Sequence, residues 1–203
     1  MNILKLFLLS FIVIWIQPVS AQINISKLSA DIGLKQNIPS SKINESNKYF
    51  IYPEIQIGGQ FIEKYLEWDV GWSYQDDGQN EPLPVADYIT YSYNSHSVGA
   101  HISFYPAYLS ETFSIPIHLI SGFSYHFVSK QYVGGYDFTG SSGADDSYGI
   151  STVDLGLGLN HNLMNNFRVR LDGMVYFPLP GDENSDIKNN SSSIQLGFDY
   201  LIN

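Results

Sequence analysis

The sequence predicts an all-β fold, an eight-stranded antiparallel up-and-down transmembrane β-barrel, preceded by a cleaved signal peptide. Eight successive segments alternate hydrophobic and polar residues with a period of two, and the connections between them are long and short in turn. Charged residues make up only 15% of the 203-residue chain, whereas 15 Tyr and 17 Gly enrich it in types common in barrels. The absence of Cys excludes disulfides, thiol nucleophiles and Cys-ligated metal sites.

The N-terminal segment, residues 1–21, has the features of a secretory signal peptide. Lys5 precedes an apolar stretch at residues 6–16, Pro18 interrupts it, and small residues occupy the cleavage positions before Gln22. The alternative is an uncleaved transmembrane anchor, but the apolar stretch is short for a span of about 20 residues. We therefore expect residues 22–203 to form the barrel.

The first four segments place hydrophobic side chains on one face. The first three alternate without interruption, and their hydrophobic positions include Leu28, Ile32, Ile51, Ile55, Trp68 and Trp72. The fourth changes phase, because Ile89 and Val98 have opposite parity. One extra residue near residues 94–97, a β-bulge, would restore a single apolar face. These four segments are residues 27–35, 49–61, 66–75 and 88–105.

The last four segments show the same alternation. Leu155, Leu157 and Leu159 oppose Asp154 and glycines, for example. The four segments are residues 115–127, 153–160, 167–177 and 194–202. An even number of strands, each of about ten residues, is typical of bacterial outer-membrane barrels.

The connections alternate in length, which orients the barrel. Those after the odd segments are long and polar: residues 36–48, 76–87, 129–148 and 179–193. Those after the even segments are shorter: residues 62–65, 106–114 and 161–166. Long extracellular loops and short periplasmic turns place both termini at the periplasmic rim.

The contents of the two faces indicate which one is outside. The polar face holds many glycines and few Lys or Glu residues, unlike the surface of a soluble lipocalin-like barrel, which is the alternative. Aromatic residues toward the strand ends predict the girdles of a membrane barrel. The predicted girdle consists of Trp68, Trp72, Tyr74, Tyr91, Tyr93, Tyr125, Phe177 and Tyr200.

These features resemble the small eight-stranded outer-membrane barrels of the OmpA transmembrane-domain and OmpX type. The blocks that carry the resemblance are residues 115–127, 151–163 and 192–203. The resemblance implies a porin-like barrel in the outer membrane of a Gram-negative bacterium, assembled by the barrel-assembly machinery. It says little about function, because the group includes adhesins, structural anchors and lipid-modifying enzymes.

The two arginines of the chain, Arg168 and Arg170, share the polar face of one segment. Buried charges require partners, so we expect them to centre a luminal ion-pair network that plugs a narrow lumen. The predicted members are Arg168, Arg170, Asp154, Asp172, Asp199 and Glu67. The alternative is a ring of charge that lines a small-solute channel.

Two His/Ser pairs have the two-residue spacing found in lipid A deacylases: His101 with Ser103, and Ser124 with His126. By parity both pairs face the lumen, away from lipid, so we expect structural roles. Acidic clusters at Asp76–Asp77, Asp145–Asp146 and residues 181–184 suit solvated loops better than calcium sites, and residues 134–140 form an aromatic loop.

The sequence thus predicts a non-enzymatic outer-membrane protein without a cofactor or a metal. We expect a monomer that contacts outer-membrane lipid and offers its surface loops to an extracellular ligand. The net charge of -10 disfavours nucleic acid as a partner. The alternative functions are a lipid A deacylase-like enzyme and a small-solute channel.

Overall fold

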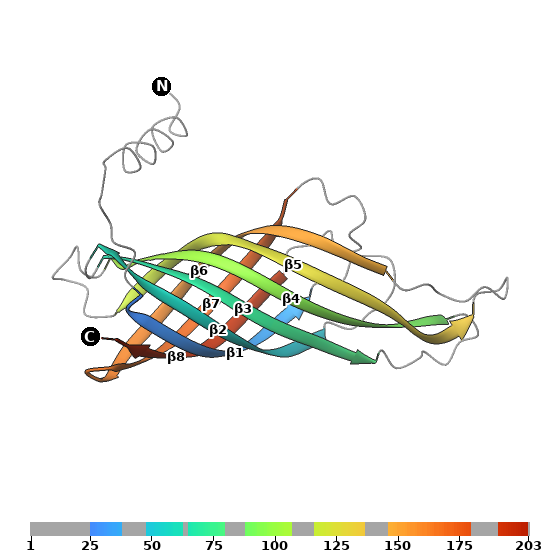
Figure 1. The fold of residues 1–203 in the computed structure, drawn as a ribbon, viewed down its shortest axis with the longest axis horizontal. Coiled ribbons are helices and arrows are strands. Elements are labelled where there is room, and N and C mark those ends of the chain that lie inside the picture. The colour runs from blue at the N-terminus through green and yellow to red at the C-terminus, as the bar shows by residue number, and fades with distance from the viewer. Residues whose placement is uncertain are drawn as a thin grey trace, which may run out of the picture.

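The computed structural model describes residues 25–37, 48–62, 65–79, 88–106, 116–136, 146–179 and 191–202. These residues form a closed barrel of eight antiparallel strands, in which each strand pairs with its neighbours in sequence and β8 pairs with β1 (Figure 1). The strands are β1 (Lys27–Asn37), β2 (Lys48–Ile62), β3 (Leu66–Gln79), β4 (Tyr88–Phe104), β5 (Ile117–Tyr136), β6 (Asp146–Met164), β7 (Phe167–Pro178) and β8 (Ser191–Leu201). The predicted fold class is therefore confirmed.

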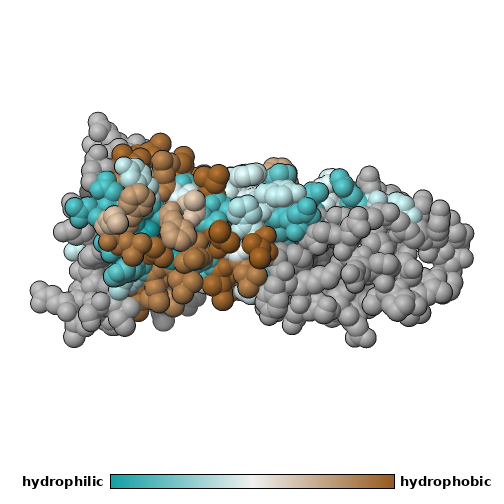
Figure 2. All heavy atoms as spheres, turned by 90° about the horizontal axis from the view of Figure 1, so that it is seen from below, coloured by the Kyte–Doolittle hydropathy of each residue, from teal (hydrophilic) through white to brown (hydrophobic). Residues whose placement is uncertain are grey.

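The alternation of the sequence becomes an inside and an outside. On the outer face Ile51 is 72% exposed and Phe123 is 64% exposed, whereas Asp154 and Asp172 on the inner face are 0% and 1% exposed. On the face seen in Figure 2, apolar side chains cover one part of the barrel, next to a more hydrophilic part. The barrel thus has an apolar exterior and a charged interior, the reverse of a soluble barrel.

No helix among the described residues is long and apolar enough to cross a membrane.

Strands β1, β7 and β8 have 11, 12 and 11 residues, close to the predicted length of about ten, whereas β2 to β6 have 14 to 20 residues, so the prediction was wrong for these five. The difference arises mainly at the end opposite Lys27, which begins β1, and Leu201, which ends β8. Pairing between β2 and β3 ends at Glu54 and Ser73, and pairing between β6 and β7 ends at Thr152 and Pro178. Strands β3 to β6 continue past these points as a four-stranded sheet that projects from the barrel (Figure 1).

This extension corrects several loop predictions. Asp76 and Asp77 lie in β3, and Asp146 begins β6. Gly134, Gly135 and Tyr136 end β5 rather than opening an aromatic loop. The rest of the predicted acidic and aromatic loop segments, 137–140, Asp145 and 181–184, lies outside the described residues.

The bulge predicted in the fourth strand is also corrected. Pairing of β4 with both neighbours is continuous from Asn94 to Phe104. The irregularities lie in the partner strands, where the β3 register shifts between Asp76 and Gln79 and the β5 register skips Val133 opposite Thr90 and Tyr91. Extra residues in β3 and β5 leave β4 itself unbroken.

Candidate functional site

The candidate site is the barrel interior, where polar side chains from every strand meet. Strand β7 supplies its two guanidinium groups, because alternation sends Arg168, Arg170 and Asp172 to the same inner face. The inner face buries acids from seven positions: Asp31, Glu54, Glu67, Asp69, Asp154, Asp172 and Asp199. Buried carboxylates of this density need cationic or hydrogen-bonding partners.

Arg168 forms the layer nearest the end where β1 begins and β8 ends. Its Nη1 and Nη2 donate to Glu67 Oε1 and Oε2 at 2.8 and 2.7 Å, a bidentate pair, and its Nε donates to Asp199 Oδ2 at 2.7 Å. The Tyr105 hydroxyl donates to Glu67 Oε2 at 2.9 Å, and Lys27 Nζ lies 3.6 Å from the same oxygen. Paired guanidinium and carboxylate groups of this geometry form the stronger class of ionic hydrogen bonds.

Arg170 forms the next layer and is only 3% exposed. Its Nε donates to Asp199 Oδ1 at 2.9 Å, and its Nη1 donates to Asp172 Oδ2 at 2.8 Å. Its Nη2 reaches across the lumen to Asp31 Oδ2 at 2.9 Å and Gln56 Oε1 at 3.0 Å. One guanidinium thus joins four strands, β7, β8, β1 and β2.

Gly197 on β8 makes room for this layer. A Cβ atom there would lie 2.5 Å from Asp31 Oδ1 and 3.1 Å from Arg170 Nη2. The glycines of the polar face therefore allow charged side chains to fill a narrow interior.

The arrangement differs in membership from the predicted network. Arg168, Arg170, Asp172, Asp199 and Glu67 lie together. Asp154 forms no ion pair with either arginine. In the β6–β7 register Asp154 lies opposite Tyr176, whereas Arg170 lies opposite Asn160, so the two residues are six positions apart along the strands. Sequence reasoning missed Asp31, which shares the inner parity of β1 and meets Arg170 only because β1 closes against β8.

A second cluster surrounds Asp154. His101 lies between two carboxylates, with Nε2 3.0 Å from Asp154 Oδ2 and Nδ1 3.2 Å from Asp69 Oδ1. Ser124 also donates to Asp154 Oδ2, and Thr152 Oγ1 donates to Asp154 Oδ1 at 2.5 Å. Asp154 is thus satisfied by an imidazole and two hydroxyls in place of a guanidinium.

The layer toward the projecting sheet combines hydroxyl and amide groups with the charged side chains of Glu54 and Lys35. Gln195 Nε2 donates to the Tyr52 hydroxyl at 2.5 Å and to Glu54 Oε2 at 3.2 Å. Lys35 Nζ lies 4.5 Å from the centroid of the Tyr176 ring, a cation–π contact.

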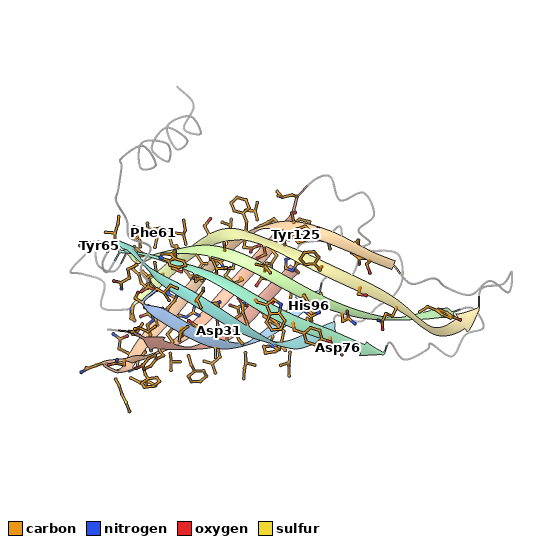
Figure 3. The ribbon with its side chains drawn as sticks, viewed as in Figure 1. Asp31, Phe61, Tyr65, Asp76, His96 and Tyr125 are labelled. Carbon is orange, nitrogen blue, oxygen red and sulfur yellow. The ribbon has the colours of Figure 1, made fainter. Side chains whose placement is uncertain are left out.

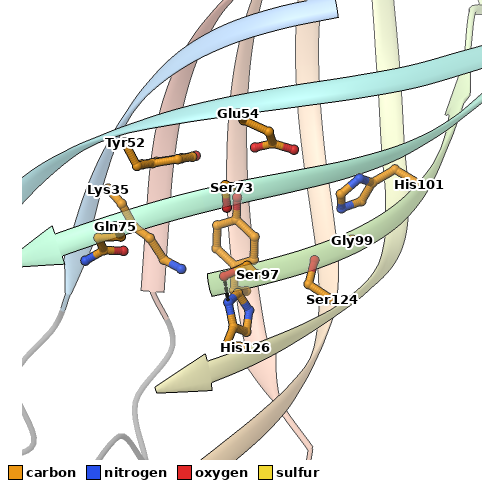
Figure 4. A pocket seen from close by; sticks show the side chains of 11 residues that line it. Lys35, Tyr52, Glu54, Ser73, Gln75, Ser97, Gly99, His101, Ser124 and His126 are labelled. Atoms are coloured by element: carbon orange, nitrogen blue, oxygen red, sulfur yellow. Dashed lines mark hydrogen bonds between the residues drawn. The ribbon is translucent and has the colours of Figure 1, made fainter. Parts of the chain in front are cut away.

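Beside this layer lies a polar cavity of about 20 Å³ (Figure 4). It has room for about one water molecule and none for a larger solute. Its lining residues include Lys35, Glu54, Ser97, His101, Ser124 and His126.

The two His/Ser pairs lie in the lumen, as their parity predicts. Ser103 is buried, and the His101 ring nitrogens face Asp69 and Asp154. His126 Nδ1 lies 2.6 Å from Ser97 Oγ, a partner that the sequence spacing did not indicate. A catalytic Ser and His need access to substrate, which neither buried pair has from the lipid side.

No group of three or more His, Asp or Glu residues in the described part of the chain is arranged to hold a metal ion.

The outer face carries six of the eight aromatic residues of the predicted girdle. Trp72, Tyr125, Phe177 and Tyr200 are exposed, and Trp68 and Tyr74 are partly exposed. The side chains of Tyr91 and Tyr93 lie outside the described part of the structure. Figure 3 shows Phe61 and Tyr65 at one end of the barrel and Tyr125 and Asp76 toward the other.

The outer face also holds a stacked group of rings. The His96 ring stacks on Trp72, with centroids 5.8 Å apart, and tilts against Tyr74 at 5.0 Å. The Tyr74 hydroxyl lies 3.5 Å from Asp76 Oδ2. Rings with a polar tip are common at the boundary between hydrocarbon and water.

No protein-family model matches the sequence, and no curated protein matches it. Solved structures do match its fold. Neisserial surface protein A has a TM-score of 0.54 at 14% identity, covering 87% of this chain and 96% of that chain. The Ail attachment invasion locus protein of Yersinia pestis has a TM-score of 0.50 at 14% identity, covering 87% and 99%.

A major outer membrane protein from Thermus thermophilus has a TM-score of 0.51 at 14% identity and also covers 87% of this chain and 99% of its own. At this identity the similarity concerns the fold. The chain therefore has the fold of the small eight-stranded outer-membrane β-barrels.

Proposed function

We propose that this chain is a non-enzymatic integral protein of the bacterial outer membrane, with a plugged polar lumen and a structural or adhesive role at its extracellular rim. The observation that carries the proposal is the inversion of the barrel. Large apolar residues such as Ile32, Ile51 and Phe123 cover its outside, and charged residues fill its inside. Such an exterior suits hydrocarbon and would be insoluble in water.

The filled interior supports a closed lumen over a channel. Arg168 and Arg170 bridge the interior through carboxylates on β1, β3, β7 and β8. The luminal cavity near Lys35, Glu54 and His126, about 20 Å³, is far below the size of a hydrated ion or a sugar. Opening a path would separate several buried ion pairs at once, which is costly.

With the outer face in lipid and the lumen closed, the surface left to bind a ligand is the end with the long connections and the projecting sheet of β3 to β6. Loops on a rigid barrel are where binding residues concentrate. One solved structure of Ail is a complex with the heparin analogue sucrose octasulfate. The net charge of -10 makes a polyanion a poor ligand for this chain.

Biogenesis follows from the same proposal. Residues 1–21 would act as the export signal, and the barrel-assembly machinery would insert residues 22–203 as a monomer in contact with outer-membrane lipid. The aromatic residues Trp72, Tyr125 and Tyr200 would lie at the lipid headgroups.

Cell fractionation and gel migration test the proposal. We expect the mature chain in the outer-membrane fraction, and we expect the unheated protein to migrate differently from the heated protein, because closed barrels resist detergent unfolding. Recovery of the folded chain as a soluble periplasmic protein would refute the membrane assignment. Stable conductance steps in planar bilayers would refute the closed lumen.

A further inference from the structure

We propose that a groove beside the turn between β6 and β7 binds a phospholipid with an ammonium headgroup. The inference rests on the membrane location in the proposed function, but not on the closed lumen. The groove measures about 530 Å³, within the range usual for small-molecule sites, and it lies at the end of the barrel where β8 ends (Figure 1). Its lining residues are Met164, Asn165, Asn166, Phe167 and Tyr200.

The walls of the groove are fixed by the turn and by its hydrogen bonds to β8. The β6–β7 register skips Leu163, so Met164 pairs with Phe167 and the two asparagines form the turn. Asn166 then bonds Leu201 twice. Its backbone O accepts from Leu201 N at 2.8 Å, and its Nδ2 donates to Leu201 O at 3.2 Å. The groove is therefore part of the paired barrel.

The rings of Phe167 and Tyr200 supply the position for a cation. The two residues pair across β7 and β8, both are exposed, and their ring centroids lie 5.2 Å apart with the planes inclined by 57°. A ligand cation within about 6 Å of a ring centroid is attracted to the ring face, and a cation in the groove can meet this distance to both rings.

The absence of charge in the groove decides between two kinds of headgroup. None of its five lining residues is charged. Acidic headgroups are bound in basic pockets, and this groove offers no Lys or Arg for that purpose. The two rings therefore favour a zwitterionic headgroup that carries an ammonium over an acidic one.

The surroundings of the groove match the rest of a phospholipid. Asn165 is exposed at the turn, and its amide can donate to a phosphate oxygen. On the other side, the outer face of β7 and β8 continues through three exposed apolar residues, Leu171, Leu196 and Phe198. The groove thus has polar groups at one end and a surface for acyl chains at the other, which is the division of a phospholipid.

A second pair of rings at the same end of the barrel provides a matched control. Phe61 on β2 and Trp68 on β3 have ring centroids 6.3 Å apart, and neither residue lines the groove. Tyr200→Leu removes a ring from the groove and keeps an apolar side chain. Tyr200→Phe keeps the ring, and Phe61→Leu removes a ring elsewhere.

The experiment uses the refolded mature barrel in a nonionic detergent, with equal amounts of phosphatidylethanolamine and phosphatidylglycerol that carry the same acyl chains. Native mass spectrometry measures how much protein retains each lipid. A cation–π contact at an exposed site changes affinity by about two- to fivefold, so we expect the wild type, Tyr200→Phe and Phe61→Leu to prefer phosphatidylethanolamine by about that factor. We expect Tyr200→Leu to retain the two lipids equally. Migration of unheated samples on gels verifies that each variant is folded.

Four results would overturn the lipid site: equal retention of the two lipids by the wild type, a preference for phosphatidylglycerol, an unchanged preference in Tyr200→Leu, or a loss of preference in Phe61→Leu. Any of these in a barrel that fractionates with the outer membrane refutes the groove alone. Recovery of the folded chain in the soluble periplasmic fraction refutes the membrane location instead.

Discussion

Replacing Arg170 with Met tests whether the luminal network holds the barrel together. Met matches much of the length of the side chain but removes the guanidinium. The change takes a partner from three buried carboxylates, on Asp31, Asp172 and Asp199.

The three carboxylates are not affected equally. Asp199 keeps Arg168 at 2.7 Å, whereas Asp172 is left only with His118, whose Nε2 lies 2.9 Å from Asp172 Oδ1 without hydrogen-bond geometry. Asp31 has no other ion-pair partner among the described residues, although it is only 2% exposed. Leaving one partner of a buried pair uncompensated costs about 3–5 kcal/mol, and we expect a loss of about 3 kcal/mol or more here because only Asp199 keeps a hydrogen-bonded cation.

The assay is urea unfolding of the refolded barrel in lipid vesicles, with the free energy of unfolding taken by linear extrapolation. The control Leu171→Met, at the adjacent outward position, should change it by no more than about 0.5 kcal/mol. Adding Asp31→Asn to Arg170→Met should restore about 1 kcal/mol or more, since it removes the uncompensated charge. A loss below about 1 kcal/mol for Arg170→Met, or no recovery in the double variant, would refute the reasoning.

The other predictions probe the outer face, the lumen and the absence of catalysis. Leu171→Arg should lower the free energy of unfolding by about 2–4 kcal/mol in the same vesicles, because it places a charge in hydrocarbon; an unchanged value would mean that Leu171 does not face lipid. Gly197→Ala should destabilise the barrel in the same titration, because its Cβ would crowd Asp31 and Arg170, and wild-type stability would contradict this packing. Expression of the wild type and of Ser103→Ala should leave host lipid A with identical mass spectra, and loss of an acyl chain with the wild type alone would establish an enzyme.

The parts of the fold that follow from period-two alternation were predictable from the sequence. The side-chain period of a strand decides which residues share a face, so strand number, order and the inward direction of Arg168 and Arg170 could be inferred. Parity does not give height along the barrel. Asp154 has the correct parity for the predicted network, but the strand register places it beside His101.

Strand length was less predictable because the hydrophobic signal ends at the apolar band. Beyond it β5 continues through Ser129, Lys130 and Gln131, and β6 begins at Asp146, where neither face is apolar. Backbone pairing still extends there, but a polar strand in water resembles a loop in sequence. The paired acid on β1 was missed for a similar reason, since Asp31 and Arg170 are 139 residues apart and only closure brings them together.

The position of Arg170 has a consequence for how the barrel folds. Its guanidinium binds Asp199 on β8 and Asp31 on β1, the two strands whose pairing closes the sheet. A partly inserted chain with this seam open would hold an incompletely neutralised cation and an unpaired acid next to hydrocarbon. Closure of the β1–β8 seam and neutralisation of Arg170 and Asp31 are therefore one event. That event depends on contacts between the first and the last strand, which are far apart in sequence. Such contacts form late and slowly, which makes closure of the seam the expected rate-limiting and committing step of insertion.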